Sequence, residues 1–231
     1  MSAHSPPVNS SEDKASSRRR RGAPRRGEAR EALMQAALEL VASEANFSAI
    51  SLRRIARQAG VVPTAFYRHF EDLDALGLTL IEDTFRSLRQ ILSDASLSAL
   101  PLKGLVRYSV ELFAHYVRDN RLLFQFVVKE RFSGTVAMRE AIHNEILLVT
   151  NALAADLARF DEFSHISQDD LRTISDLVVN TVITLSERIL DVDPDNAEDD
   201  ALMLRAEKQL RLIFMGVGRW ESRPADTDTT A

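Results

Sequence analysis

The sequence predicts an all-α protein, and three observations support this class. From Glu28 almost to the end of the chain, apolar residues recur at intervals of three and four, the spacing of amphipathic helices. No stretch of useful length alternates apolar and polar residues as a half-buried strand would. Only eight glycines serve all 231 residues. We therefore expect helices that bury their apolar faces against one another.

The individual helices follow from their apolar stripes and end signals. The first begins at Glu28, and the second, over 51–59, is capped by Ser51. The third, over 63–69, has Pro63 in its first turn, where a missing N–H costs nothing. A long fourth helix is predicted over 72–98; at 1.5 Å per residue it would span roughly 40 Å and could link two regions. Further helices are expected near 101–117, 121–131, 135–160, 167–191 and 199–218, with an acidic loop at 191–200.

Composition excludes several classes of protein. Hydrophobic residues make up 45% of the chain and charged residues 27%, the balance of a soluble globular protein. The apolar runs are far shorter than the ~18–20 residues of a membrane span, so no membrane partner is expected. No apolar segment follows the N-terminal arginines, so no secretory signal is expected. Without cysteine there can be no disulfide, thiol catalysis or Cys-ligated metal, and we expect a cytoplasmic protein.

Charge is distributed unevenly along the chain. Residues 1–75 hold 12 Lys+Arg and 9 Asp+Glu, which leaves 17 and 25 for the remainder. The front is therefore net basic and the body acidic, which suggests that only the front meets a polyanion. Residues 1–27 are predicted to be a disordered tail with six arginines between Arg18 and Arg26, either a solvated tail or an arm that contacts phosphates or the minor groove. Residues 221–231 are predicted to be a disordered C-terminus.

The stretch SLRRIARQAGVVPTAFYRHF (51–70) carries the most information. Two short helices are joined by Ala59-Gly60-Val61. The small side chain of Ala56 lets the second helix cross closely, and Gly60 can take the positive φ of a tight turn. Leu52, Ile55, Val61, Phe66 and Phe70 would form the packed inner faces. This pattern is typical of a helix-turn-helix, whose second helix enters the major groove of DNA.

The outward residues of this motif are the candidate DNA contacts. Val62 and Thr64 can offer methyl groups and a hydroxyl to base edges. Pro63, which starts the second helix, is a further candidate. Phosphate oxygens suit Tyr67, Arg68 and His69. The first helix adds two more phosphate candidates, Arg53 and Arg54. The alternative interpretation is an ordinary αα-hairpin whose tyrosine packs locally.

Residues 28–88 resemble the DNA-binding domain of the TetR family of bacterial regulators, through Ala36-Ala37, SLRRIARQAG and FYRHF. Within this block, PTAFYRHFEDLDALGL resembles the FabR/DesT group of fatty-acid biosynthesis repressors, as do KERFSGTVAMREAI (129–142), DLVVNTVI (176–183) and QLRLIFMGVGRW (209–220). The resemblance implies a helix-turn-helix head and, over 89–220, a ligand-binding and dimerisation body. It also implies a homodimer that reads a near-palindromic operator in double-stranded DNA.

Two apolar stripes bear on the dimer. Leu171, Ile174, Val178, Val182, Leu185 and Ile189 form one, and Leu202, Ala206, Leu210, Ile213 and Val217 form the other. Such stripes fit a four-helix dimer interface and equally an intrachain core. The resemblance favours the interface.

The resemblance further implies an effector rather than a cofactor. The FabR/DesT likeness points to a repressor of unsaturated fatty-acid synthesis or lipid genes that responds to a long-chain acyl thioester, on CoA or acyl carrier protein. Candidates for an apolar lining, each equally readable as plain core, are Phe113, Tyr116, Phe124, Val127, Leu147, Val178 and Val182. Lys129, Arg131 and Arg139 could bind the anionic end or form a solvated basic patch.

Enzyme interpretations find no support in the sequence. There is no P-loop or dinucleotide fingerprint, and the five histidines lack metal-ligand spacing. Glu82 and Asp83 are adjacent and so point to different sides of a helix. Two alternatives to the acyl-responsive repressor remain: a TetR-type regulator of another hydrophobic effector, and a helical lipid carrier that does not bind DNA.

Overall fold

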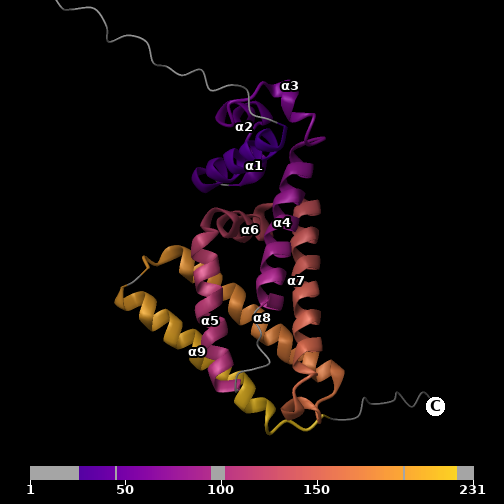
Figure 1. Cartoon of the computed structure of the whole chain (residues 1–231), viewed down its shortest axis with the longest axis vertical. Coiled ribbons are helices and arrows are strands. Elements are labelled where there is room, and N and C mark those ends of the chain that lie inside the picture. The colour runs from indigo at the N-terminus through magenta and orange to yellow at the C-terminus, as the bar shows by residue number, and fades with distance from the viewer. Residues whose placement is uncertain (1–25, 45, 95–101, 195, 223–231) are drawn as a thin grey trace, which may run out of the picture.

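The computed structural model describes residues 26–44, 46–94, 102–194 and 196–222, and within these ranges every regular element is a helix (Figure 1). The predicted all-α class is therefore confirmed. Most of the predicted N-terminal tail and of the predicted C-terminal tail lies outside the described residues. The first four helical elements form a head at one end of the molecule, and the later helices form a larger body (Figure 1).

The head consists of α1 (Arg26–Ser43), the short 3-10 helix η1 (Phe47–Ala49), α2 (Leu52–Gln58) and α3 (Pro63–Phe66). The predicted cap of α2 is present, since the Ser51 hydroxyl accepts a hydrogen bond from the Arg54 N–H. The third helix is shorter than predicted: beyond Phe66 the chain continues in tight turns, with the His69 N–H donating to the Phe66 carbonyl. The helix η1 was not predicted.

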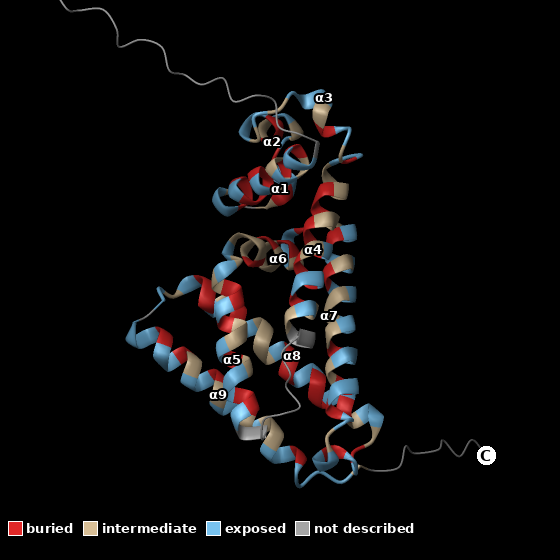
Figure 2. Ribbon diagram, viewed as in Figure 1, coloured by how far each residue is buried: buried red, intermediate tan, exposed pale blue. Residues whose placement is uncertain are grey.

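One long helix, α4 (Leu73–Asp94), starts in the head and runs into the body (Figure 1). Its 22 described residues span roughly 33 Å at 1.5 Å per residue. The body contains α5 (Leu102–Asp119), α6 (Arg121–Ser133), α7 (Val136–Leu157), η3 (Asp161–Phe163), α8 (Gln168–Asp191) and α9 (Ala197–Val217). Buried residues line the inward faces of these helices (Figure 2).

Part of the predicted acidic loop is helical. Asn196 caps α9 by accepting hydrogen bonds from the N–H groups of Glu198 and Asp199. Three carboxylates then fall in the first turn of α9, where they complement the positive end of the helix dipole. Asp199 is buried and forms an ion pair with Arg118 of α5, so one of these acidic residues ties α9 to the body.

The two apolar stripes of the last helices pack inside the chain. All their members are buried within the single chain except Val182 and Ile213, which are half-buried. The expectation that these stripes form a dimer interface was therefore wrong, because the two stripes pack against each other and against α5, α6 and α7 of the same chain. The exposed apolar residues of α8 and α9 are different ones: Leu177, Leu204, Leu212 and Met215.

Candidate nucleic-acid interface

The turn between α2 and α3 has the predicted geometry. Gly60 has a φ of +69°, a conformation that other L residues adopt only with strain. The Val61 N–H donates to the carbonyl of Ala56 at 2.9 Å, and Ala56 itself is fully buried. The small side chain and the glycine together hold α3 across α2, so the prediction for this pair is confirmed.

Three large side chains anchor α3 and the turn after it. Ile55, Phe66 and Phe70 are buried, and the rings of Phe66 and Phe70 lie 5.6 Å apart. Leu52 and Val61, also predicted for the inner face, are half-buried. Because the inner side of so short a helix is fixed by these contacts, its outer side is presented in a defined orientation.

The outer side of α3 carries the predicted base-reading residues. Val62 is 64% exposed, Tyr67 is 63% exposed, and Pro63 and Thr64 are also exposed. The Tyr67 ring contacts Phe66 edge to face at 5.8 Å, yet most of the ring remains in solvent. The αα-hairpin alternative requires the tyrosine to pack against its neighbours. Because most of the Tyr67 ring lies in solvent, the structure does not support that alternative. Arg68 is exposed and His69 is half-buried.

The two arginines predicted on α2 differ in their surroundings. Arg53 is exposed, whereas the guanidinium of Arg54 forms an ion pair with Glu44 at the end of α1. Arg57, which sequence reasoning missed, is exposed one turn after Arg53. The i, i+4 spacing of these two arginines was the available signal. The exposed side of α2 therefore presents two guanidinium groups to solvent.

A polar contact fixes the exposed end of α2 to α1. The Gln58 amide donates to a Glu39 carboxylate oxygen at 2.9 Å, and Gln35 donates to the other oxygen at 3.0 Å. These hydrogen bonds, first that of Gln35 and then that of Gln58, hold the pKa of the Glu39 carboxyl below its ordinary value. The carboxylate thus stays ionised while it bridges the two helices.

Among the predicted effector residues, three aromatic rings meet where α5 and α6 pack. Tyr116 and Phe113 each contact Phe124 edge to face, at 5.6 and 6.0 Å. The Tyr116 hydroxyl donates to the Thr84 carbonyl of α4 at 3.4 Å, and burial raises the pKa of this phenol. Tyr116 and Phe124 are buried, whereas Phe113 is half-buried. We call Phe113, Tyr116 and Phe124 the aromatic trio.

The other predicted effector residues are dispersed. Val127 is half-buried one turn beyond Phe124, Val178 and Val182 lie on α8, and Leu147 is 45% exposed on α7. The three predicted cations do not converge on one opening. Lys129 is directed at the head, Arg131 lies over the exposed ring of Phe132, and Arg139 donates to the carbonyl of Gly134.

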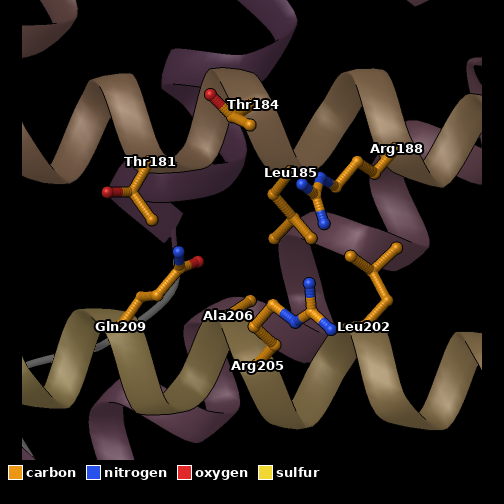
Figure 3. A pocket seen from close by; sticks show the side chains of 8 residues that line it. All are labelled: Thr181, Thr184, Leu185, Arg188, Leu202, Arg205, Ala206 and Gln209. Atoms are coloured by element: carbon orange, nitrogen blue, oxygen red, sulfur yellow. The ribbon is translucent and has the colours of Figure 1, made fainter.

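Two hollows lie against α9. A groove of about 370 Å³ between α5 and α9 is lined by Arg107, Val110, Glu111, Asp200, Met203, Leu204 and Glu207, so carboxylates outnumber cations in it. A smaller hollow of about 40 Å³ between α8 and α9 brings the guanidinium groups of Arg188 and Arg205 toward each other, beside Thr181, Thr184 and Gln209 (Figure 3).

A helix-turn-helix head on a larger helical body defines a class of DNA-binding regulators. Residues 33–77 match the family model described as bacterial regulatory proteins, tetR family, and residues 102–216 match the Tetracyclin repressor-like, C-terminal domain. The chain belongs to the TetR family. It is a transcriptional regulator and not an enzyme.

Solved structures show the same fold. A transcriptional regulator from Rhodococcus sp. Rha1 superposes with a TM-score of 0.64 at 17% identity, over 81% of this chain and 96% of the other. The regulator FadR from Bacillus subtilis, solved in complex with stearoyl-CoA, gives 0.63 at 16%, over 80% and 98%. NalD, the secondary repressor of the MexAB-OprM multidrug efflux pump in Pseudomonas aeruginosa, gives 0.60 at 22%, over 82% and 95%. None of the described helices has the length and apolarity to cross a membrane.

Proposed function

We propose that this regulator is a repressor that binds a near-palindromic operator as a homodimer and responds to a long-chain acyl thioester. The observation that carries DNA binding is the division of α3 into two sides. Phe66 is buried against the rest of the head, while Val62, Thr64 and Tyr67 face solvent. A helix held this way can enter the major groove without rearrangement.

The contacts divide into two kinds. Val62 and Thr64 lie at the start of α3 and read base edges, including the methyl group of thymine. Tyr67, Arg53 and Arg68 bind phosphates and set the register of the head on the duplex. The six arginines between Arg18 and Arg26, which lie almost entirely outside the described residues, add phosphate or minor-groove contacts. Such a protein acts on the chromosome, in the cytoplasm.

The homodimer forms through the exposed sides of α8 and α9. Leu177, Leu204, Leu212 and Met215 are exposed there, and a second copy would cover them in a two-fold, self-complementary interface. The two heads would then read half-sites about one DNA turn apart, roughly 34–36 Å or somewhat more.

The effector is a molecule with a long apolar chain. The aromatic trio supports this choice, because one of its members, Phe113, and the neighbouring Val127 are only half-buried at the junction of α5 and α6. Part of this apolar surface is therefore open to a ligand. The likeness to FadR, solved with stearoyl-CoA, and the segments that resemble fatty-acid biosynthesis repressors support an acyl thioester. The acidic groove between α5 and α9 does not suit the phosphates of CoA, so we place the acyl chain beside the trio instead. The targets we propose are genes of unsaturated fatty-acid synthesis or of lipids.

DNA binding is tested by fluorescence anisotropy with the DNA upstream of the protein's own gene at ~0.1 M salt. We expect Tyr67→Phe to weaken binding to all operator variants alike, by about threefold to tenfold, because it removes one phosphate hydrogen bond. Thr64→Ala should instead change the preference among operator variants. Tyr108→Phe, at an exposed tyrosine of α5, is the matched control. Binding to none of these duplexes would exclude the repressor and favour a lipid carrier.

The effector is tested with oleoyl-CoA and palmitoyl-CoA in the same assay. At least one of them should change the operator affinity, and the two should differ. Mass spectrometry of the small molecules retained by the purified protein gives an independent answer. A different hydrophobic molecule that is retained and alters DNA binding would replace the acyl thioester but leave the DNA-binding half of the proposal intact.

A further inference from the structure

Two adjacent residues near the end of α6, in the body, form hydrogen bonds with the head. The Lys129 ammonium donates to three carbonyls at the C-terminal end of α1: those of Val41 at 2.7 Å, Ala42 at 3.3 Å and Glu44 at 2.9 Å. The last carbonyls of a helix lack intrahelical partners and carry the negative end of its dipole. A cation from another helix, 85 or more residues away, therefore caps α1.

Glu130 makes the second contact. Its side chain is fully buried, and its Oε1 accepts a hydrogen bond from the Phe47 N–H of η1 at 2.8 Å. The other oxygen, Oε2, is buried without a hydrogen-bond partner. A buried carboxylate that makes a single hydrogen bond is costly, and such a group persists where it has a role beyond packing. Gly134 leaves room for it, since a Cβ there would lie 3.1 Å from Oε2.

The side chain of Phe47 is held by the same helix. Its ring is buried and packs edge to face on Phe126, one turn before Glu130, with centroids 5.5 Å apart. Helix α6 thus contacts both the backbone and the side chain of Phe47 in η1. The opposite end of α6 carries Phe124 of the aromatic trio. At 1.5 Å per residue, the five to six positions from Phe124 to Lys129 and Glu130 correspond to roughly 8–9 Å of helix between the trio and the contacts with the head.

We propose that Lys129 and Glu130 form a latch, in which they act as positioning residues that fix the orientation of the DNA-binding head relative to the body. Because α6 joins the latch to the aromatic trio, a displacement of α6 in the body reaches the head directly as well as through α4. The latch rests on the proposed DNA-binding function, but its existence as a constraint on the head does not depend on the identity of the effector.

The test uses the full-length protein in two pairs of variants. Lys129→Met and Glu130→Leu break the latch, while Lys129→Arg keeps the cation and Glu130→Gln keeps an acceptor for the Phe47 N–H. Arg159→Met removes an exposed guanidinium far from the head and is the control. Circular-dichroism melting checks that each variant folds; if a broken variant does not, its conservative partner combined with Phe126→Leu weakens the same junction.

Amide hydrogen exchange reads the latch in the free protein. We expect the Phe47 amide to exchange at least about tenfold faster in Glu130→Leu and nearly as in wild type in Glu130→Gln. A spin label on Glu71→Cys, in a chain with no other cysteine, reports the distance between the two heads of the dimer. That distance distribution should broaden in both broken variants, and operator affinity should fall by about tenfold, because the heads lose a fixed relative orientation.

The outcomes separate the latch from the proposed function. Unchanged exchange at Phe47 together with an unchanged distance distribution would overturn the latch, even if the protein binds its operator. Faster exchange in a protein that binds no operator would support the latch as a constraint and reject the repressor. Equal effects of the broken and conservative variants would reduce the two residues to a general packing role, which also contradicts the proposal.

Discussion

Gly77 of α4 lies directly against Met138 of α7. A Cβ added to Gly77 would lie 2.3 Å from the Cε of Met138 and 3.3 Å from Cε1 of Phe47. Met138 is fully buried, so its side chain has little space into which it can withdraw. The missing side chain of one glycine therefore lets α4, α7 and η1 meet at the point where α4 leaves the head.

Gly77→Ala should destabilise the protein by up to about 2 kcal/mol, because overpacking a full core costs about 1–3 kcal/mol and the higher helix propensity of alanine offsets about 0.5–1 kcal/mol of it. The physical cause is the overlap with Met138, so Met138→Val should cost less in the Gly77→Ala background than in wild type. Urea unfolding of the four proteins of this double-mutant cycle measures the coupling. Strictly additive free energies would show that the cost of Gly77→Ala does not arise from overlap with Met138.

Gly60 and Gly104 make a matched pair, because a Cβ at either position would meet nothing within 4 Å. They differ in backbone: Gly60 has a φ of +69°, and Gly104 lies within α5. Gly60→Ala should cost about 1–2 kcal/mol through the left-handed conformation alone. Gly104→Ala should stabilise by about 0.5–1 kcal/mol, because alanine has the higher helix propensity. Thermal unfolding that moved both midpoints in one direction would contradict this account.

The helices could be predicted because their signals are local. The apolar spacing of α8, the Ser51 cap and the Gly60 turn each depend on residues within a few positions of one another. The division of α3 into a buried and an exposed side followed from the same spacing. A periodic pattern identifies the buried side of α8 and α9 but not what covers it, which is why the stripes could be assigned wrongly to a dimer interface.

The junction of head and body could not be predicted, because its contacts are distant in sequence. The Phe47 N–H and Glu130 are 83 positions apart, and Lys129 lies 88 positions from Val41. In the sequence, Lys129 is one of several cations near the end of an amphipathic helix, and a basic residue there suits an anionic ligand equally well. Only the packing of α6 on α1 shows that its partners are backbone carbonyls.

Arg53 and Arg54 should differ in how they contribute to DNA binding. Arg53 is exposed, so it can displace counterions from a phosphate, and Arg53→Ala should reduce the slope of log K against log salt by about 0.9. Arg54 is already paired with Glu44, so Arg54→Ala should change the slope by less. Titrations at several salt concentrations measure both slopes, with Arg159→Ala as the control. Equal losses from Arg53→Ala and Arg54→Ala would mean that DNA breaks the Glu44 ion pair.

The latch also predicts how stability depends on pH. Burial raises the pKa of the Glu130 carboxyl above its ordinary value of 4.5, and the Phe47 hydrogen bond and the charge of Lys129 offset this only in part. Relative to the unfolded chain, folding therefore favours the protonated form of Glu130. The stability that this preference contributes is fully present below pH 4.5 and is lost as the pH rises through the raised pKa of the folded state.

Glu130→Gln removes this titration but keeps an acceptor for the Phe47 N–H. The free energy of unfolding of wild type, minus that of Glu130→Gln, should therefore fall as the pH rises from about 4.5 toward neutrality and level off above the raised pKa. Urea unfolding of both proteins across this range measures the difference, and other titrating groups cancel because they are common to the two. A difference that is constant, or that grows with pH, would mean that Glu130 stays ionised throughout, with solvent or a cation reaching Oε2.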